Sequence, residues 1–212
     1  MAKQIDISLD LETWGTTPGS DIRSIGACVF DPLTGITCGH NDNNLPGIKT
    51  FYIACDNPII AYIGDSPHAY KYNALTRDPR TVQWWSEQSD EAQAAFADPV
   101  DLRDALIQFG RWLFGVSCKY AGYCHDYEGF NPVSNIRLWS HGAAFDPPIL
   151  AAAYEAVGLP VPWHYRAPRD TRTLFDAAGI EDHSALLARH PGPMGVAHHA
   201  LDDAICQARA VC

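Results

Sequence analysis

The chain has 212 residues, of which 47% are apolar and 19% are charged, and its formal net charge is −10. This composition is typical of one large globular domain and excludes a disordered chain. No run of eighteen apolar residues occurs, so neither a membrane span nor a membrane partner is expected. The surplus of acids excludes a protein that coats long nucleic acid nonspecifically, because such binding requires bases to neutralise phosphates. It does not exclude an enzyme whose acids bind metal ions.

The first part of the chain has the pattern of β-strands. In residues 5–12, isoleucine and leucine alternate with polar residues, which is the two-residue period of a strand. Residues 22–31 and 48–55 indicate two further strands, with the turn-rich segment 31–47 between them. These segments predict a three-stranded antiparallel meander.

Helices dominate the remainder of the chain. The apolar spacing predicts helices and a strand in this order: a helix over 79–96, a helix over 101–114, a long loop at 117–135, a strand at 136–142, a helix over 146–158, a strand or helix start at 169–179, a loop at 192–199 and a last helix over 200–212. Strands followed by alternating helices indicate an α/β fold with helices packed on a mixed sheet. No linker is apparent, so residues 1–212 are expected to form a single domain.

Acidic residues stand where a core strand should be apolar. Asp10 and Glu12 lie two residues apart, so both side chains point to the same side of the first strand. Either they lie on an exposed strand face, or a ligand offsets the cost of burying two neighbouring charges. Asp146 can similarly be only the N-cap of its helix, and Asp202 and Asp203 can simply favour the dipole of the last helix.

Acids from three distant segments have a known chemical use when they converge. Mg²⁺ and Mn²⁺ prefer oxygen ligands, and several carboxylates together can hold two such ions. A pair of ions of this kind clamps the attacking and leaving oxygens of a phosphodiester. Bound metal would also offset the mutual repulsion of the acids, which explains why a buried strand would contain them.

The motifs carry a family resemblance. LDLETWG, WSHGAAFDPPIL and HHALDDA, together with SIGACVFDP, TVQWWSEQSDEAQ and RDTRT, resemble the DEDDh superfamily of 3′–5′ exonucleases, and more closely its small single-domain bacterial and phage exoribonucleases. The resemblance covers residues 5–210. It implies a ribonuclease H-like fold, in which an antiparallel meander continues into parallel strands flanked by helices. It also implies hydrolysis of the terminal phosphodiester of single-stranded RNA to nucleoside 5′-monophosphates.

The resemblance assigns roles by position in this sequence. The ligands of two Mg²⁺ or Mn²⁺ ions would be Asp10, Glu12, Asp146 and Asp203. His198, five residues before Asp203, would be the general base, since a pKa near 6.5 suits proton transfer at neutral pH. His199 and Asp202 are immediate neighbours of these choices. Successive helix residues project about 100° apart, so only one of Asp202 and Asp203 can face the metals.

Substrate contacts are expected beside the metal ligands. The candidates are Leu11, Thr13, Trp14, Phe145 and Arg169. Leu11 and Trp14 have an equal claim to ordinary core packing, and Arg169 can lie on a solvated face with the nearby Arg166 and Arg172. Trp85 is expected in the core.

Two features depart from the superfamily pattern. Gly142 stands where many members have asparagine, and the segment 118–135 looks like an insertion beside the site. Both bear on how substrate is held rather than on the metal chemistry.

The sequence also indicates a binding partner and a cellular location. The 3′ end of single-stranded RNA or DNA is the expected partner, and a homodimer is implied by resemblance only. The alternatives to an exoribonuclease are a DNA exonuclease of the same chemistry and a non-catalytic nucleotide-binding module. The seven cysteines form no CxxC pair, which favours free thiols and a cytoplasmic location.

Overall fold

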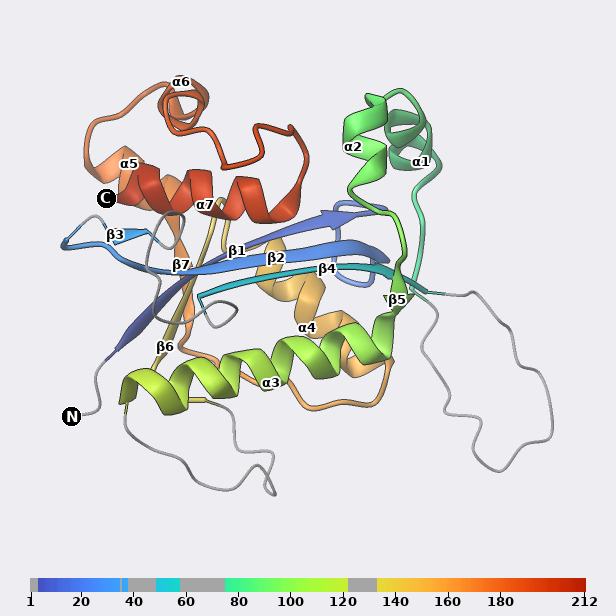
Figure 1. Cartoon of the computed structure of the whole chain (residues 1–212), viewed down its shortest axis with the longest axis horizontal. Helices are drawn as coiled ribbons and strands as arrows, with labels where there is room; N and C mark the ends of the chain where they lie inside the picture. The colour runs from blue at the N-terminus through green and yellow to red at the C-terminus, as the bar shows by residue number, and fades with distance from the viewer. Residues whose placement is uncertain (1–3, 35, 38–48, 58–74, 122–132) are drawn as a thin grey trace.

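The computed structural model describes residues 4–34, 36–37, 49–57, 75–121 and 133–212 (Figure 1). Its strands are β1 (Ile5–Thr13), β2 (Ile22–Asp31), β3 (Ile36–Thr37), β4 (Thr50–Asp56), β5 (Val100–Asp101), β6 (Ile136–Ser140) and β7 (Pro168–Asp170). Its helices are α1 (Pro79–Ser86), α2 (Asp90–Ala94), α3 (Leu102–Ala121), α4 (Asp146–Ala156), α5 (Thr171–Ala177), α6 (His183–Ala188) and α7 (Ala200–Val211). No helix within these described ranges is long and apolar enough to cross a membrane.

The described strands form one mixed sheet in the order β5-β4-β2-β1-β6-β7, and β3 pairs with β2. β1, β2 and β4 are antiparallel neighbours, which confirms the expected meander. β6 pairs parallel to β1, and β7 pairs parallel to β6. β1 is therefore a central strand, flanked on both sides and buried along most of its length.

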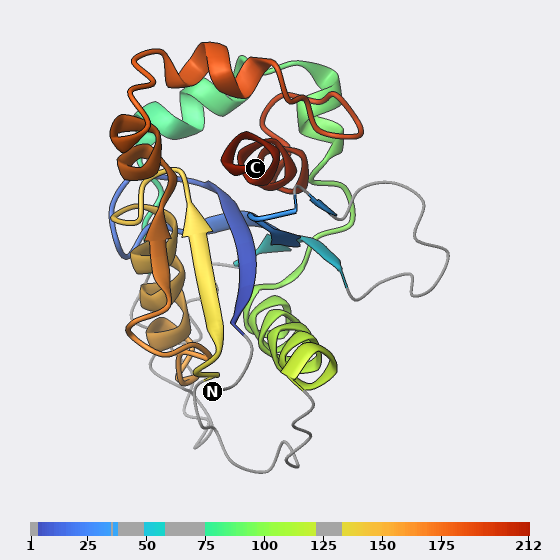
Figure 2. The ribbon, with the colours of Figure 1, turned by 90° about the vertical axis from the view of Figure 1, so that its left-hand side faces the viewer.

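Helices cover both faces of the sheet (Figures 1 and 2). The larger hydrophobic core lies between the sheet and α3 and α4, and it contains Phe109, Leu113 and Ile149 among its buried residues. On the opposite face, α7 packs over β1 and β2 through a smaller buried cluster of Cys28, Phe30, Ile205 and Ala208. The two cores are thus unequal, and the last helix belongs to the smaller one.

Gly26 allows α7 to lie directly on the sheet. A Cβ atom at this position would be 2.1 Å from the carbonyl carbon of Ala200 and 2.2 Å from the backbone nitrogen of Leu201. A glycine within a strand often marks such a close backbone approach. Gly26 pairs with Asp10 across β1 and β2, so the start of α7 is brought next to that acid.

The structure corrects several predicted boundaries. The single helix expected over 79–96 is two helices, because α1 ends at Ser86 and the hydroxyl of Ser89 accepts a hydrogen bond from the N–H of Ala92 to start α2. The turn-rich segment 31–47 contains β3, although most of that segment lies outside the described residues. The segment 169–179 is both alternatives in succession, the end of β7 followed by α5. α6 was not predicted.

The long loop predicted at 117–135 is also different. Its first five residues belong to α3, and residues 122–132 lie outside the described part of the chain. Ser117 donates a hydrogen bond to the side chain of Asn135 (2.8 Å), and the carbonyl of Asn135 accepts one from the N–H of Ile5 (2.9 Å). Both described ends of the segment therefore lie at the start of β1, whereas the predicted site is in its second half. The segment expected to be an insertion beside the site lies mostly outside the described residues, so this expectation stays a prediction.

Candidate active site

Four acids from three elements converge at the second half of β1. Asp10 and Glu12 are on β1, Asp146 is the first residue of α4, and Asp203 is in the first turn of α7. The carboxylate of Asp146 accepts a hydrogen bond from the backbone N–H of Leu11 (3.1 Å), which holds it against the strand between the other two acids. Asp146 is therefore not the N-cap of its helix; Phe145 occupies that position and makes no side-chain capping bond.

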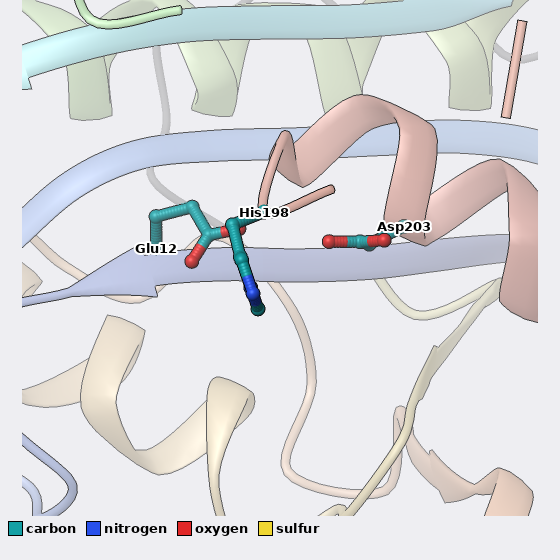
Figure 3. A group of neighbouring side chains, drawn as sticks. All are labelled: Glu12, His198 and Asp203. Carbon is teal, nitrogen blue, oxygen red and sulfur yellow. The ribbon is translucent and has the colours of Figure 1, made fainter. Parts of the chain in front are cut away.

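Glu12 and Asp203 of this group lie close to His198. Each offers one ligand atom, and these atoms all lie within 4.8 Å of one another. Figure 3 shows the three side chains coming from β1, from the loop before α7 and from α7 itself. A DxE strand motif and an HxxxxD helix motif, far apart in the sequence, thus meet in one place.

Burial and mutual repulsion raise the pKa values of the acids. Burial raises the pKa of Glu12 to about 8, with repulsion from Asp203 and Asp146 adding to it and attraction to Arg23 opposing it. Burial raises the pKa of Asp146 to about 7, and that of Asp203 to about 6. The pKa of Asp10 is also raised well above its usual range, first by burial and then by the other three acids.

The donor set fits divalent metal ions. Buried carboxylates with raised pKa values are under-compensated, because the nearest described partners are a neutral amide for Asp10 and the guanidinium of Arg23 for Glu12. Gln207 on α7 donates that amide bond to Asp10 over 2.8 Å. Hard cations favour clusters of carboxylate oxygens of this kind. Asp10, Glu12, Asp146 and Asp203 are the residues that would hold Mg²⁺ or Mn²⁺.

The two adjacent histidines have different surroundings. His198 faces the acids and adopts a left-handed backbone conformation with φ of 60°, which for a non-glycine residue costs roughly 1–3 kcal/mol. Burial lowers its pKa below the ordinary value, so it is neutral at neutral pH. His199 is 6% exposed, stacks on Tyr52 with ring centroids 4.2 Å apart, and is the N-cap of α7.

The two adjacent aspartates, Asp202 and Asp203, also have different surroundings. Asp203 faces the acids, whereas the carboxylate of Asp202 accepts hydrogen bonds from the backbone N–H groups of Met194 and Val196 in the preceding loop. The rotation between successive helix residues produces this division, as expected. Asp202 is 2% exposed and does not belong to the group of Glu12, His198 and Asp203 that could hold a metal ion.

A pocket of about 540 Å³ opens beside the acids. Three expected substrate contacts, Leu11, Thr13 and Phe145, line it together with His198. Among the lining residues that sequence reasoning missed are Arg80, Thr81 and Trp84, all on α1. The Trp84 ring is 40% exposed and meets the His198 ring edge-on, with centroids 4.8 Å apart.

Two expected substrate contacts are not among the described residues that line this pocket. The ring of Trp14 lies between the guanidinium groups of Arg23 and Arg77, at 4.3 and 4.8 Å from its centroid. The guanidinium of Arg169 donates to the backbone carbonyls of its own neighbourhood, including that of Pro168 at 2.8 Å. Arg172 acts on the site instead, because its charge lowers the pKa of Asp146, as the charge of Arg23 does for Glu12.

Other local details explain the sequence around the site. Trp85 is buried, as expected, and its indole N–H donates to the carbonyl of Thr13 over 2.9 Å, which fixes α1 to the end of β1. Gly142, where many superfamily members have asparagine, has a φ of 118°, a conformation that favours glycine. The guanidinium carbon of Arg172 lies 3.8 Å from the position that a Cβ on Gly142 would take.

Weak signals for the missed residues were present in the sequence. Gln207 is one helical turn after Asp203, so the i, i+4 rule places it on the same face of α7. Trp84 precedes a buried tryptophan in an amphipathic helix, which predicts exposure but not the direction in which the ring points. Arg80 is one turn before Trp84 on the same helix.

Solved structures share this fold. The chain matches cell-death related nuclease 4 (CRN-4) over 99% of its own length and 62% of that chain, with a TM-score of 0.58 and 13% identity. It matches the nuclease domain of 3′hExo, a DEDDh family member solved with bound rAMP, over 98% and 90% of the two chains, with a TM-score of 0.53 and 12% identity. The Mg²⁺- and Mn²⁺-bound form of Pop2p from S. pombe matches over 97% and 80%, with a TM-score of 0.53 and 14% identity. The chain thus spans less than two thirds of the CRN-4 chain.

These structural similarities identify the fold class of the chain. The mixed sheet flanked by helices is the ribonuclease H-like fold of DEDDh exonucleases, as the motif resemblance implied. No curated protein sequence matches the chain. The family model of the 3′–5′ exoribonuclease Rv2179c-like domain, however, matches residues 5–212. The chain therefore belongs to this family and is a 3′–5′ exonuclease.

Proposed function

We propose that the chain is a divalent-metal-dependent exoribonuclease that removes nucleoside 5′-monophosphates from the 3′ end of single-stranded RNA. The observation that carries the proposal is the convergence of four carboxylates and one histidine beside a pocket large enough for a nucleotide. The family description, an exoribonuclease domain, supports RNA as substrate. The 3′hExo nuclease domain binds a ribonucleotide, which agrees with this choice.

Two Mg²⁺ or Mn²⁺ ions held by Asp10, Glu12, Asp146 and Asp203 would supply Lewis-acid activation of water and neutralise the charge of the phosphodiester. In the acid group itself, Gln207 fixes the orientation of Asp10 and the Leu11 N–H fixes that of Asp146. Both ligands are therefore oriented before substrate arrives.

His198 is proposed as the general base. Its ring is neutral at neutral pH because burial lowers its pKa, so a ring nitrogen can accept a proton from the attacking water. The water oxygen bonds to phosphorus as the bond from phosphorus to the 3′ oxygen breaks. The products are an RNA one residue shorter, with a 3′ hydroxyl, and a nucleoside 5′-monophosphate.

The terminal nucleotide is proposed to occupy the pocket beside the acids. Leu11, Thr13 and Phe145 line this pocket, and so does Trp84, which is 40% exposed. An aromatic ring of this kind stacks on a base with an energy of about 1–3 kcal/mol and without strong preference for its identity. Arg80 also lines the pocket, and its positive charge would attract a phosphate of the RNA.

Degradation of RNA labelled at its 5′ end tests the proposal. The wild-type chain with Mn²⁺ is expected to give a ladder that shortens from the 3′ end, and EDTA is expected to stop it. Asp146→Asn should abolish the ladder, whereas Asp176→Asn, which changes an acid on α5 that is 73% exposed, should not. Release of the labelled 5′ nucleotide as the first product would contradict the polarity.

Two further comparisons separate the alternatives. Matched RNA and DNA oligomers digested in parallel decide the sugar preference, and faster digestion of DNA would overturn the choice of RNA. His198→Ala should reduce turnover by at least a hundredfold. A His198→Ala variant that behaves in every respect like the wild type would favour a non-catalytic nucleotide-binding module.

We also propose that residues 1–212 act as one exonuclease domain, in the cytoplasm and as a homodimer. The connected sheet supports the first point, the absence of any CxxC pair in the sequence supports the second, and resemblance alone supports the third. Light scattering of the purified chain tests the dimer, for which a monomeric mass at micromolar concentration would be the contrary result.

A further inference from the structure

The loop before α7 is fastened by a buried carboxylate that does not belong to the metal-binding group. Oδ2 of Asp202 accepts hydrogen bonds from the N–H of Met194 (3.0 Å) and from the N–H of Val196 (3.2 Å). Oδ1 accepts a longer bond from the same Met194 N–H (3.3 Å). A carboxylate that accepts backbone N–H groups makes stronger bonds than a neutral acceptor, so this is a firm attachment.

The loop also packs closely against the same side chain. A Cβ at Gly192 would lie 2.3 Å from the Cβ of Asp202 and 2.4 Å from its carboxylate carbon, so the loop backbone rests on Asp202. Gly195, between the two bonded N–H groups, has a φ of 66° and completes a turn around the carboxylate. Residues 192–196 are thus wrapped around one side chain of α7.

Asp202 has an electrostatic cost in this position. It lies next to Asp203 and its charge raises the pKa of that residue, which adds to the repulsion within the acid group. A neutral residue would avoid the repulsion. The charge is offset by the backbone N–H groups that Asp202 binds, and these belong to the segment that leads into His198.

We propose that Asp202 is a positioning residue for the general base. It joins the loop that carries His198 to the helix that carries Asp203, so the base and a metal ligand keep a fixed relation to each other. The left-handed backbone of His198 comes two residues after Val196, directly beyond the attached segment. The inference rests on the proposed role of His198 and adds that an acid outside the metal group sets its place.

The main test is Asp202→Asn, with turnover of a single-stranded RNA oligomer as readout. Asparagine keeps the shape but loses the charge, and one end of its amide cannot accept an N–H. We expect kcat to fall by about tenfold to a hundredfold, as for other misplaced catalytic groups. KM and the affinity for Mn²⁺, measured by calorimetry, should stay within twofold because Asp203 is retained. Glu155→Gln, which removes an exposed charge on α4, is the matched control and should leave kcat unchanged.

A double-mutant cycle distinguishes positioning from a general structural role. If Asp202 acts through His198, Asp202→Asn should cause no further loss of turnover in the His198→Ala background. Losses that multiply in the double variant, or a kcat unchanged in the single variant, would overturn the proposal.

Two further measurements test the proposal without relying on the turnover of the Asp202→Asn variant. Amide hydrogen exchange at Met194 and Val196 should accelerate in Asp202→Asn and not in Glu155→Gln; equal exchange in both would contradict the attachment. If Asp202→Asn does not fold, Gly192→Ala displaces the loop while leaving Asp202 intact, and should show the same kcat loss and the same lack of effect in His198→Ala. An inactive wild-type chain with Mn²⁺ would instead refute the proposed function and, with it, the positioning role, while the exchange result would still decide whether Asp202 attaches the loop.

Discussion

Replacing Gly26 by alanine tests whether the contact between β2 and α7 places the catalytic groups. The added Cβ would be 2.1 Å from the carbonyl carbon of Ala200, whereas ordinary contacts at a Cβ begin at 3.4 Å. The obstacle is helix backbone, which cannot rotate away as a side chain can. The start of α7 must therefore retreat by about 1 Å or more, since close-packed interiors leave no free volume.

The consequence for function should exceed the consequence for stability. Overpacking of this kind costs about 1–3 kcal/mol, a fall of several degrees in Tm for a chain of this size. Asp203 and His198 are attached to the displaced segment, and a shift of about 1 Å in catalytic groups costs about a hundredfold in rate. We expect kcat on an RNA oligomer to fall by that factor while circular dichroism still shows a folded protein.

Gly115→Ala provides the control. A Cβ at Gly115 meets no atom within 4 Å, and the residue is exposed in the interior of α3. Alanine there should stabilise the chain by up to about 1 kcal/mol and leave the rate unchanged. A Gly26→Ala variant with kcat within twofold of the wild type would refute the argument that this contact places the site.

Three more outcomes are expected. The pKa of Glu12 is raised from 4.5 to about 8, so between these two pH values the metal-free folded state binds more protons than the unfolded state. Its free energy of unfolding should therefore fall by roughly a few kcal/mol as pH rises through this window. Melting curves in EDTA and in Mn²⁺ should show that metal raises Tm more at pH 8 than at pH 5, and equal increases in Tm would contradict this. Trp84→Ala should raise KM for RNA about fivefold to a hundredfold if the ring stacks on a base, with Tyr165→Ala, also an exposed aromatic, as the unaffected control in the same kinetics. Gln207→Leu removes the amide that orients Asp10 and should weaken Mn²⁺ binding about tenfold in calorimetry, whereas unchanged affinity would show that the metal alone orients this acid.

Much of the fold follows from local patterns. The alternation in residues 5–12 predicted β1, and the three antiparallel strands were predicted with boundaries within two residues. β3 was missed because two residues in a turn-rich segment give no periodic signal. The break between α1 and α2 depends on one capping serine, Ser89, inside a stretch that otherwise has helical spacing.

The part of the site that lies within sequence motifs was predicted from the sequence. The family resemblance assigned the four acids and His198 by position, and the structure brings them together. Helix rotation separates Asp202 from Asp203, but only the structure shows what Asp202 binds instead. Trp84 and Arg172 were not predicted as neighbours of the acids, because the placement of α1 and α5 against β1 depends on tertiary packing that no local pattern encodes.

The inequality of the two cores has a consequence for how the protein loses activity. The sheet, α3 and α4 share the large apolar cluster, while α7 is held by the small one formed with Cys28 and Phe30. Detachment of the last helix would break only the smaller apolar cluster and would leave the larger core folded, so we expect it to precede global unfolding. Such an opening removes Asp203 and His198 together. Heat inactivation is therefore expected to begin below the temperature of global melting and to reverse on cooling. Divalent metal, which under the proposed function would join Asp203 of α7 to the acids of β1, should bring the two temperatures together.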